Sequence, residues 1–249
     1  MRPILKYPRT PHLAGSRLQP GDEDLRVIGI ESLDGLSLVF EEKLDGSNSG
    51  IGFDADGGLI LQSRGHVLTG GPRERQFDLF KRWASHHTNA LKKILGCRYT
   101  MYGEWLYARH TIAYDQLPHY FLEFDVLDRE TGNFLSTEMR RTLLAGGPVV
   151  SVPMLGTGTV ASIGQYLGRS RCSSTELMEG LYLKHEVDGR VMARSKFVRT
   201  DFRQAAAESD PRWMDRPIEP NRLRAGVDLF VRSVDGVPAT YNRSCGPIP

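Results

Sequence analysis

The segment Glu42-Lys43-Leu44-Asp45-Gly46-Ser47-Asn48 decides how this sequence is interpreted. It places a lysine at the end of a predicted strand that begins at residue 37, directly before a polar turn that contains glycine. A lysine in this position can project into a cleft, while a glycine turn lets the backbone approach a phosphate closely. The pattern Lys-x-Asp-Gly alone arises by chance in roughly one chain in twenty of this length. An ordinary Asp-Gly turn at a solvated strand end therefore stays open until further residues are considered.

Outward from this segment, the sequence predicts an antiparallel hairpin. Residues 49–53 alternate small and apolar side chains, residues 54–58 read Asp-Ala-Asp-Gly-Gly, and residues 59–63 are apolar again. A turn rich in Asp and Gly between two such runs is typical of a hairpin. The hairpin brings Lys43 and Arg64 to the same end of the sheet.

The rest of the chain mixes strand and helix patterns, which predicts an α+β domain. Apolar spacing predicts amphipathic helices within residues 74–95, a helix at 137–145 capped by Thr137, and short helices at 162–167 and 174–178. Aromatic and apolar runs predict strands at residues 99–106 and 120–127 and a second hairpin formed by 181–184 and 190–198. Residues 1–21 are rich in Pro, Arg and Gly, and we expect them to form an irregular arm with room for one short strand.

Charged residues recur on the predicted strands in a particular order. After Lys43 the chain reads Ser63-Arg64-Gly65, Tyr102-Gly103-Glu104, Phe121-Leu122-Glu123-Phe124-Asp125-Val126, Glu179-Gly180-Leu181-Tyr182-Leu183-Lys184 and Arg194-Ser195-Lys196. In this series the sequence resembles the covalent nucleotidyltransferases, the superfamily of ATP-dependent RNA ligases, DNA ligases and RNA-capping guanylyltransferases. It looks most like the RNA ligase 2 type. Taken singly, each charge is an ordinary surface charge and Phe124 an ordinary core residue, but their joint order favours the functional interpretation.

The resemblance implies a nucleotidyltransferase fold, the adenylation domain of ligases, in which mainly antiparallel sheets flanked by helices enclose a nucleotide cleft. It implies ATP as a substrate, Mg²⁺ or Mn²⁺ as a cofactor, RNA ends as partners, and Lys43 as the nucleophile that forms a lysyl-AMP. The other implied contacts are Glu42 and Phe124 with adenine, Glu104 with ribose hydroxyls, Asn48 and Arg64 on the ribose and phosphate side, Glu179 and Asp45 with the metal, and Lys184, Arg194 and Lys196 with the phosphates.

Two positions depart from the pattern of the RNA ligase 2 type. That pattern has His where Asp45 stands, which leaves the role of Asp45 open between the metal and the attacking hydroxyl. It has Lys where Arg194 stands, so the positive charge is kept but a point charge becomes a planar fork.

The chemistry requires an activated lysine. A free lysine has a pKa of about 10.4, so the amine of Lys43 must lose its proton before it attacks phosphorus. We expect Lys184, Arg194, Lys196 and a metal ion to crowd around Lys43, disfavour its protonated form and stabilise the transferring phosphate. Mg²⁺ suits such a site because it binds one or two carboxylates together with phosphate oxygens and waters.

Length and composition limit the possible functions. The chain has 249 residues, 40% of them hydrophobic, and a net charge of +2, so any basic site must be local. We expect a nucleotidyltransferase domain at residues 1–202 and a short tail at 203–249 that packs on it or extends it. This tail is too short for the OB-fold that DNA ligases and capping enzymes append, which favours an RNA ligase. A DNA ligase, an RNA-capping guanylyltransferase and a non-catalytic nucleotide or RNA sensor remain alternatives.

The cysteines and apolar runs indicate the compartment. Cys97, Cys172 and Cys245 are odd in number and far apart, which supports neither a disulfide framework nor a thiolate zinc site. No uninterrupted apolar run is long enough to span a bilayer. We therefore expect a cytoplasmic protein that does not associate with a membrane.

Overall fold

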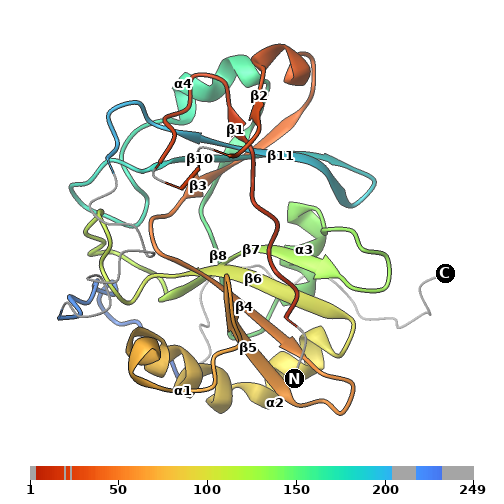
Figure 1. Cartoon of the computed structure of the whole chain (residues 1–249), viewed down its shortest axis with the longest axis vertical. Helices are drawn as coiled ribbons and strands as arrows, with labels where there is room; N and C mark the ends of the chain where they lie inside the picture. Colours follow the sequence, from red (N-terminus) through yellow and green to blue (C-terminus); the bar gives the residue numbers. More distant parts are fainter. Residues whose placement is uncertain (1–3, 20, 23, 204–216, 232–249) are drawn as a thin grey trace.

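The computed structural model describes residues 4–19, 21–22, 24–203 and 217–231, and in this part of the chain strands form two sheets (Figure 1). The expected tail at residues 203–249 therefore lies partly outside the described residues. Cys245 lies outside them as well. Both sheets are largely antiparallel, and short helices lie beside them, as the α+β prediction requires. Among the described helices, none has the length and apolar character needed to cross a membrane.

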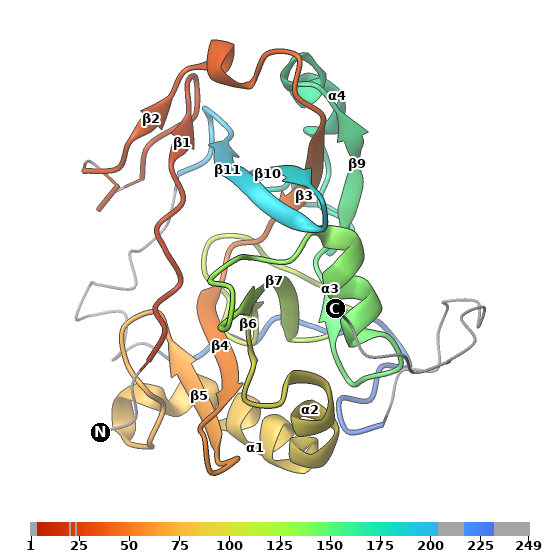
Figure 2. The ribbon, with the colours of Figure 1, turned by 90° about the vertical axis from the view of Figure 1, so that its right-hand side faces the viewer.

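The first sheet has six strands. In spatial order they are β2 (Val27–Ile28), β1 (His12–Leu13), β11 (Arg190–Val198), β10 (Gly180–Val187), β3 (Leu38–Lys43) and β9 (Met154–Gly158). The pair β10–β11 confirms the second predicted hairpin, and Gly180 of β10 stands opposite Lys43 of β3. Strand β1 runs parallel to β11, with His12 beside Lys196, so the predicted irregular arm contributes a short strand to this sheet (Figure 2).

The second sheet has five strands. In spatial order they are β5 (Leu59–Ser63), β4 (Ser47–Phe53), β6 (Tyr99–Trp105), β7 (Phe121–Asp128) and β8 (Val150–Ser151). The pair β4–β5 confirms the first predicted hairpin. Because only residues 44–46 separate β3 from β4, the segment around Lys43 is where the chain passes from one sheet into the other.

The helical segments lie beside the sheets, and the helix Asp78–His86 packs on a face of the five-stranded sheet. They are η1 (Ile30–Leu33), η2 (Pro72–Phe77), α1 (Asp78–His86), α2 (Thr88–Leu95), α3 (Thr137–Leu144), η3 (Val160–Ser162) and α4 (Ile163–Tyr166). Helix α3 is capped by Ser136, whose hydroxyl accepts a hydrogen bond from the amide of Met139, so the prediction of Thr137 as the cap is wrong by one residue. Thr137 instead donates its hydroxyl to Glu186.

The helix predicted at residues 174–178 is also wrong. This segment is irregular, and Leu177 forms an isolated bridge with Arg169. The hydroxyl of Ser173 accepts the amides of Thr175 and Glu176, although the first of these contacts is long at 3.4 Å. A serine side chain that satisfies nearby amides in this way competes with helix formation.

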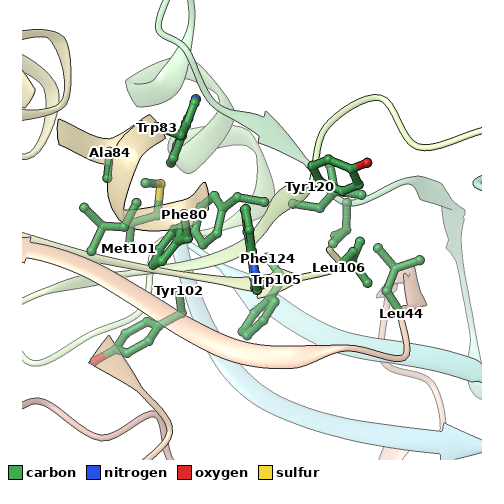
Figure 3. Packing of buried hydrophobic residues seen from close by; sticks show 14 of the residues in the cluster. Leu44, Phe80, Trp83, Ala84, Met101, Tyr102, Trp105, Leu106, Tyr120 and Phe124 are labelled. Atoms are coloured by element: carbon green, nitrogen blue, oxygen red, sulfur yellow. The ribbon is translucent and has the colours of Figure 1, made fainter. Parts of the chain in front are cut away.

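The larger hydrophobic core packs the five-stranded sheet against α1 (Figure 3). Phe80 and Trp83 of α1 are fully buried and stack on Phe121 of β7 at ring-centroid distances of 5.3 and 5.7 Å. Full burial of one such side chain is worth roughly 1.5–3 kcal/mol. A smaller core covers the six-stranded sheet and includes Leu38 and Phe40. The turn at residues 44–46 thus connects two sheets that each have a core of their own.

Candidate active site

A pocket of about 560 Å³ is lined by residues of both sheets and of the N-terminal segment, residues 4–22. From the predicted site the lining includes Glu42, Lys43, Asp45, Asn48, Arg64, Glu104, Phe124, Glu179 and Lys196. The structure thus brings together residues that are spread over about 150 positions of the sequence. It does not bring Lys184 and Arg194 into the lining.

Lys43 forms an ion pair with Glu179 at the pocket wall. The distance from Nζ to Oε1 is 2.6 Å, because the start of β10 at Gly180 lies opposite Lys43 in the sheet. Burial alone lowers the pKa of Lys43, but the carboxylates of Glu179, Glu104 and Asp45 outweigh it and hold the pKa above its ordinary value. Burial raises the pKa of Glu179 to about 7. Among the protein groups around Lys43, carboxylates therefore outweigh the cations that the sequence led us to expect there.

Lys196 is the cation that the structure places beside Lys43. Its pKa is lowered by burial and by the positive charge of Lys43. Its Nζ lies 2.8 Å from Asp22, which also contacts His12 at 2.8 Å. Burial alone raises the pKa of Asp22, but hydrogen bonds from His12 and Lys196 hold it well below its usual range. The pocket thus holds a second lysine in a fixed position.

Asp45 is tied to the loop at residues 106–117. Its Oδ2 accepts the amides of Thr111 and Ile112 at 2.7 and 3.0 Å, and its own amide donates to the hydroxyl of Tyr114 at 2.8 Å. One carboxylate oxygen predicted to face a metal or the attacking hydroxyl is therefore committed to backbone amides.

Glu42 and Phe124, the residues expected to contact adenine, both belong to the pocket lining, one from β3 and the other from β7. Glu42 is buried, and it accepts the hydroxyl of Ser170 and, at 2.8 Å, the amide of Arg171. Burial raises the pKa of Glu42 despite these hydrogen bonds. Phe124 stacks on Tyr182 with ring centroids 6.0 Å apart. The rings of Phe124 and Tyr182 can pack against a flat base, whereas the carboxylate of Glu42 is already bound to Ser170 and Arg171, outside the lining.

Polar groups from the second sheet complete the lining. Asn48 of β4 and Glu104 of β6 stand opposite each other in the antiparallel register, so their side chains share one face of the sheet. Arg64, just after β5, is exposed and reaches the pocket from the end of the hairpin, near Lys43 as predicted.

Lys184 is fully buried beneath the pocket. Its Nζ donates to the carbonyl of Phe124 at 2.5 Å and forms ion pairs with Asp125 at 2.8 Å and Glu41 at 2.9 Å. It shares a face of β10 with Tyr182, which does line the pocket, but two strand residues place it about 7 Å farther along. The prediction that Lys184 reaches the phosphates is not supported by this position.

Arg194 also lies behind the lining. Its guanidinium stacks 4.0 Å from the ring centroid of Phe134 and lies 3.3 Å from Asp125. The same buried group includes Arg140 of α3, which pairs with Glu41 of the first sheet and, at 2.5 Å, with Glu123 of the second. This network fastens the two sheets together under the pocket, and the expected contact of Arg194 with phosphate finds no support in it.

The N-terminal segment is the part of the site that the sequence did not predict. It contributes Tyr7, Pro8, Arg9, Thr10, Gln19, Gly21 and Asp22 to the lining. Pairing of β1 with β11 brings this segment to the pocket. The apolar residues of this segment do not recur at helical or strand spacing, so its sequence does not predict that it lines a pocket.

The pocket residues can bind a divalent cation whose other ligands are substrate phosphates and waters. Within the described residues, no group of three or more His, Cys, Asp or Glu side chains is arranged to hold a metal ion. Glu179 does offer an oxygen, because its Oε2 is buried and has no hydrogen-bond partner among the residues described. Mg²⁺ commonly binds one or two carboxylates together with substrate phosphates and waters. Glu179 is therefore the residue suited to such an ion.

Comparisons with known proteins identify a family and a fold. A family model described as RNA ligase matches residues 36–205, while no curated protein matches the sequence.

Among solved structures, the chain is similar to an RNA ligase from Naegleria gruberi. One structure, a variant with AMP and Mn, has a TM-score of 0.58 at 21% identity over 79% of this chain and 56% of that one. A variant with ATP and Mn has a TM-score of 0.54 at 22% identity over 68% and 52%. The ligase with pyrophosphate has a TM-score of 0.54 at 20% identity over 79% and 56%. The likeness shows a shared fold, and this chain spans about half the length of those structures.

Proposed function

The chain belongs to the RNA ligase family, and on that premise we propose that it is an ATP-dependent RNA ligase that seals 5′-phosphate and 3′-hydroxyl ends through a lysyl-AMP intermediate. The observation that carries the proposal is the position of Lys43 at the wall of a pocket that also holds Glu104, Glu179 and Lys196. A nucleophile, two carboxylates and a second cation in one pocket are the groups that transfer of a nucleotide requires. The Naegleria structures with ATP, AMP and pyrophosphate support a nucleotide as the occupant.

In the first step, the Lys43 amine attacks the α-phosphorus of ATP. A phosphorus–nitrogen bond forms, the bond from the α-phosphorus to the bridging oxygen breaks, pyrophosphate leaves, and Lys43 gives up a proton. Glu179 orients the amine through its contact at 2.6 Å, while Lys196 offers positive charge to the phosphates. A Mg²⁺ or Mn²⁺ ion bound at Glu179 would supply positive charge that neutralises this carboxylate and so lowers the pKa of Lys43.

The remaining contacts divide between the base and the sugar. We assign Glu42 and Phe124 to adenine, and Glu104, Asn48 and Arg64, which also line the pocket, to ribose and phosphate. Lys184 and Arg194 act from below by holding the β7 backbone and Asp125 in place. Asp45 fixes the turn after the nucleophile rather than acting as a metal ligand.

Two transfers then seal the strand. A 5′-phosphate oxygen of RNA attacks the adenylate phosphorus, so that the bond to Lys43 breaks and an RNA–adenylate anhydride forms. The 3′-hydroxyl next attacks the activated 5′-phosphorus, a phosphodiester forms, and AMP leaves.

Within the family we propose the RNA ligase 2 type and a nucleotidyltransferase fold with its cleft at the pocket. The order of motifs from Lys43 to Lys196 supports this assignment. We also propose that residues 1–202 are the adenylation domain and that the tail extends it, supported by the contacts of residues 217–231 with residues 106–117. The described cysteines, Cys97 and Cys172, are free thiols, which supports our proposal of a cytoplasmic protein.

Covalent labelling tests the proposal. Incubation with α-labelled ATP and Mg²⁺ should attach one AMP per chain, Lys43→Ala should abolish labelling, and Lys81→Ala, on helix α1 away from the pocket lining, should label like the wild type. Labelling of Lys43→Ala would refute Lys43 as the nucleophile. Reversible ATP binding without a covalent adduct would identify a sensor instead.

The acceptor is tested separately with nicked duplexes. Sealing of a nick with RNA at the 3′-hydroxyl end is expected, whereas selective sealing of DNA would identify a DNA ligase. Labelling by GTP in preference to ATP would identify a capping enzyme. RNA binding should weaken steeply with salt because the partner is a polyanion.

A further inference from the structure

The chain segment at residues 217–231 lies beyond the part that the family model matches, yet it is bound to the loop at residues 106–117. Pro220 bridges Ala108 in antiparallel fashion, and Leu223 bridges Leu117 in parallel. Five backbone amides of described residues are paired across this contact, and the three shortest bonds run from Arg109 to Glu219 at 2.7 Å, from Asn221 to Tyr107 at 2.8 Å and from Arg222 to Tyr114 at 2.8 Å.

Asn221 is the centre of this contact. Its side chain is buried, with Oδ1 accepting the amide of Tyr114 at 2.9 Å and Nδ2 donating to the carbonyl of Leu106 at 2.8 Å. Its carbonyl accepts the hydroxyl of Tyr120 at 2.9 Å. The backbone amide and both side-chain polar groups of Asn221 therefore bind the loop, and the bond to its Oδ1 holds the backbone of Tyr114.

The loop in turn holds the turn that follows Lys43. Tyr114 is 1% exposed, and its hydroxyl accepts the amide of Asp45 at 2.8 Å. The carboxylate of Asp45 accepts two amides from the same loop. The backbone amide and the carboxylate of Asp45, two residues after Lys43, are thus both bound to the loop at residues 106–117.

The turn at residues 44–46 is closely packed, so its backbone has little room to adopt another conformation. A Cβ on Gly46 would stand 2.7 Å from the carbonyl oxygen of Trp105 and 2.8 Å from Leu106, so the turn backbone lies directly on this part of the loop. Leu44 and Leu106 lie at the same end of the core as Tyr120 (Figure 3). The contacts therefore run without a break from Asn221 through Tyr114 and Asp45 to the segment that carries Lys43.

We propose that Tyr114 and Asn221 are positioning residues for the nucleophile, through which the tail segment at residues 217–231 sets the geometry of Lys43. The inference rests on the proposed function of Lys43. A reacting group misplaced by about 1 Å loses on the order of a hundredfold in rate, so an anchor of the neighbouring turn acts on the chemical step. Binding of ATP depends mainly on other residues of the pocket, so its affinity changes little.

Tyr114→Phe removes one hydroxyl and leaves the aromatic packing in place. At saturating ATP, the single-turnover rate of Lys43 adenylation should fall about tenfold, less than the hundredfold of a full 1 Å misplacement, because two of the three hydrogen bonds that anchor Asp45 remain. The ATP dissociation constant should stay within about threefold of the wild type, since a positioning defect acts on the chemical step. Tyr166→Phe is the matched control: it loses a hydroxyl that donates to the carbonyl of Thr157 at 2.7 Å, outside the pocket lining, and should adenylate at the wild-type rate.

Two further measurements complete the test. Asn221→Ala should slow adenylation in the same direction as Tyr114→Phe, and if it does not fold, Tyr114→Phe alone decides. Hydrogen exchange of peptides covering residues 43–48 should be faster in Tyr114→Phe than in the wild type and unchanged in Tyr166→Phe.

A wild-type rate in folded Tyr114→Phe, or unchanged exchange of these peptides, would overturn the inference. If the wild type forms no adenylate at all, the proposed function fails, while the exchange measurement still decides whether Tyr114 holds the turn.

Discussion

Replacement of Lys184 by methionine separates a structural role from a phosphate-binding role. In the structure this lysine is fully buried and bonded to Glu41, Asp125 and the carbonyl of Phe124. Removing one partner of a buried ion pair typically costs about 3–5 kcal/mol, because the remaining charge stays buried without compensation. Here Glu41 keeps Arg140, and Asp125 keeps Arg194 and Tyr7, so the lower end, about 3 kcal/mol, is expected.

Urea unfolding measures this cost, and Lys196→Met is its matched control. With a slope of about 3 kcal/mol per molar urea, the midpoint of Lys184→Met should fall by about 1 M. Lys196 lies at the pocket wall, and its partner Asp22 keeps His12, so Lys196→Met should lose only about 1 kcal/mol. It should nevertheless lose most adenylation, because it removes a cation from the pocket. If Lys184→Met unfolds at the wild-type midpoint but loses adenylation, Lys184 acts on the phosphates and the structural assignment is refuted.

Three further predictions concern acid, the turn and the metal. Burial lowers the pKa of His119 to about 4 from the ordinary 6.5. Between these two pH values the imidazole is protonated in the unfolded chain but neutral in the folded chain, so the free energy of unfolding should fall by about 3 kcal/mol as pH drops from 6.5 to 4. His119→Asn should flatten that decline in urea midpoints measured at each pH, and an equally steep decline would contradict it. Gly46→Ala should lower the free energy of unfolding by about 1–3 kcal/mol and slow adenylation, because its Cβ would collide with the Trp105 carbonyl. Gly164→Ala in helix α4, where a Cβ meets open space, should change neither quantity. EDTA should stop adenylation without moving the urea midpoint, because no cluster of metal ligands was found among the described residues, and Mg²⁺ or Mn²⁺ should restore it; a lower midpoint would reveal a structural metal.

The two hairpins could be predicted because their signals are local. Residues 47–63 and 180–198 carry an alternating or apolar pattern on both sides of a Gly-containing turn, and the strands formed where the pattern placed them. The motif residues lie at or near strand ends, so correct strands were enough to bring Lys43, Glu104 and Glu179 to one pocket. Their chemical roles stay predictions.

The errors have physical causes. Thr137 and Ser136 are both good caps, and neighbouring residues decide between them: Glu186, 49 residues away, takes the Thr137 hydroxyl. The contact of Asp22 with Lys196 spans 174 residues and leaves no trace in local periodicity. Strand alternation assigns Lys184 to the correct face, but how deep it lies on that face depends on β7 and α3 packed around it.

The pairing of β1 with β11 has a consequence for the order of events during synthesis. One wall of the pocket, the segment that carries Asp22, is made 174 residues before its partner Lys196. At 5–20 residues per second, the ribosome needs about 9–35 s to connect them. For most of that interval Lys43 and the first hairpin already exist, but Asp22 has no Lys196 to pair with. A nascent chain therefore cannot hold nucleotide in a complete pocket until its last described strand has been made.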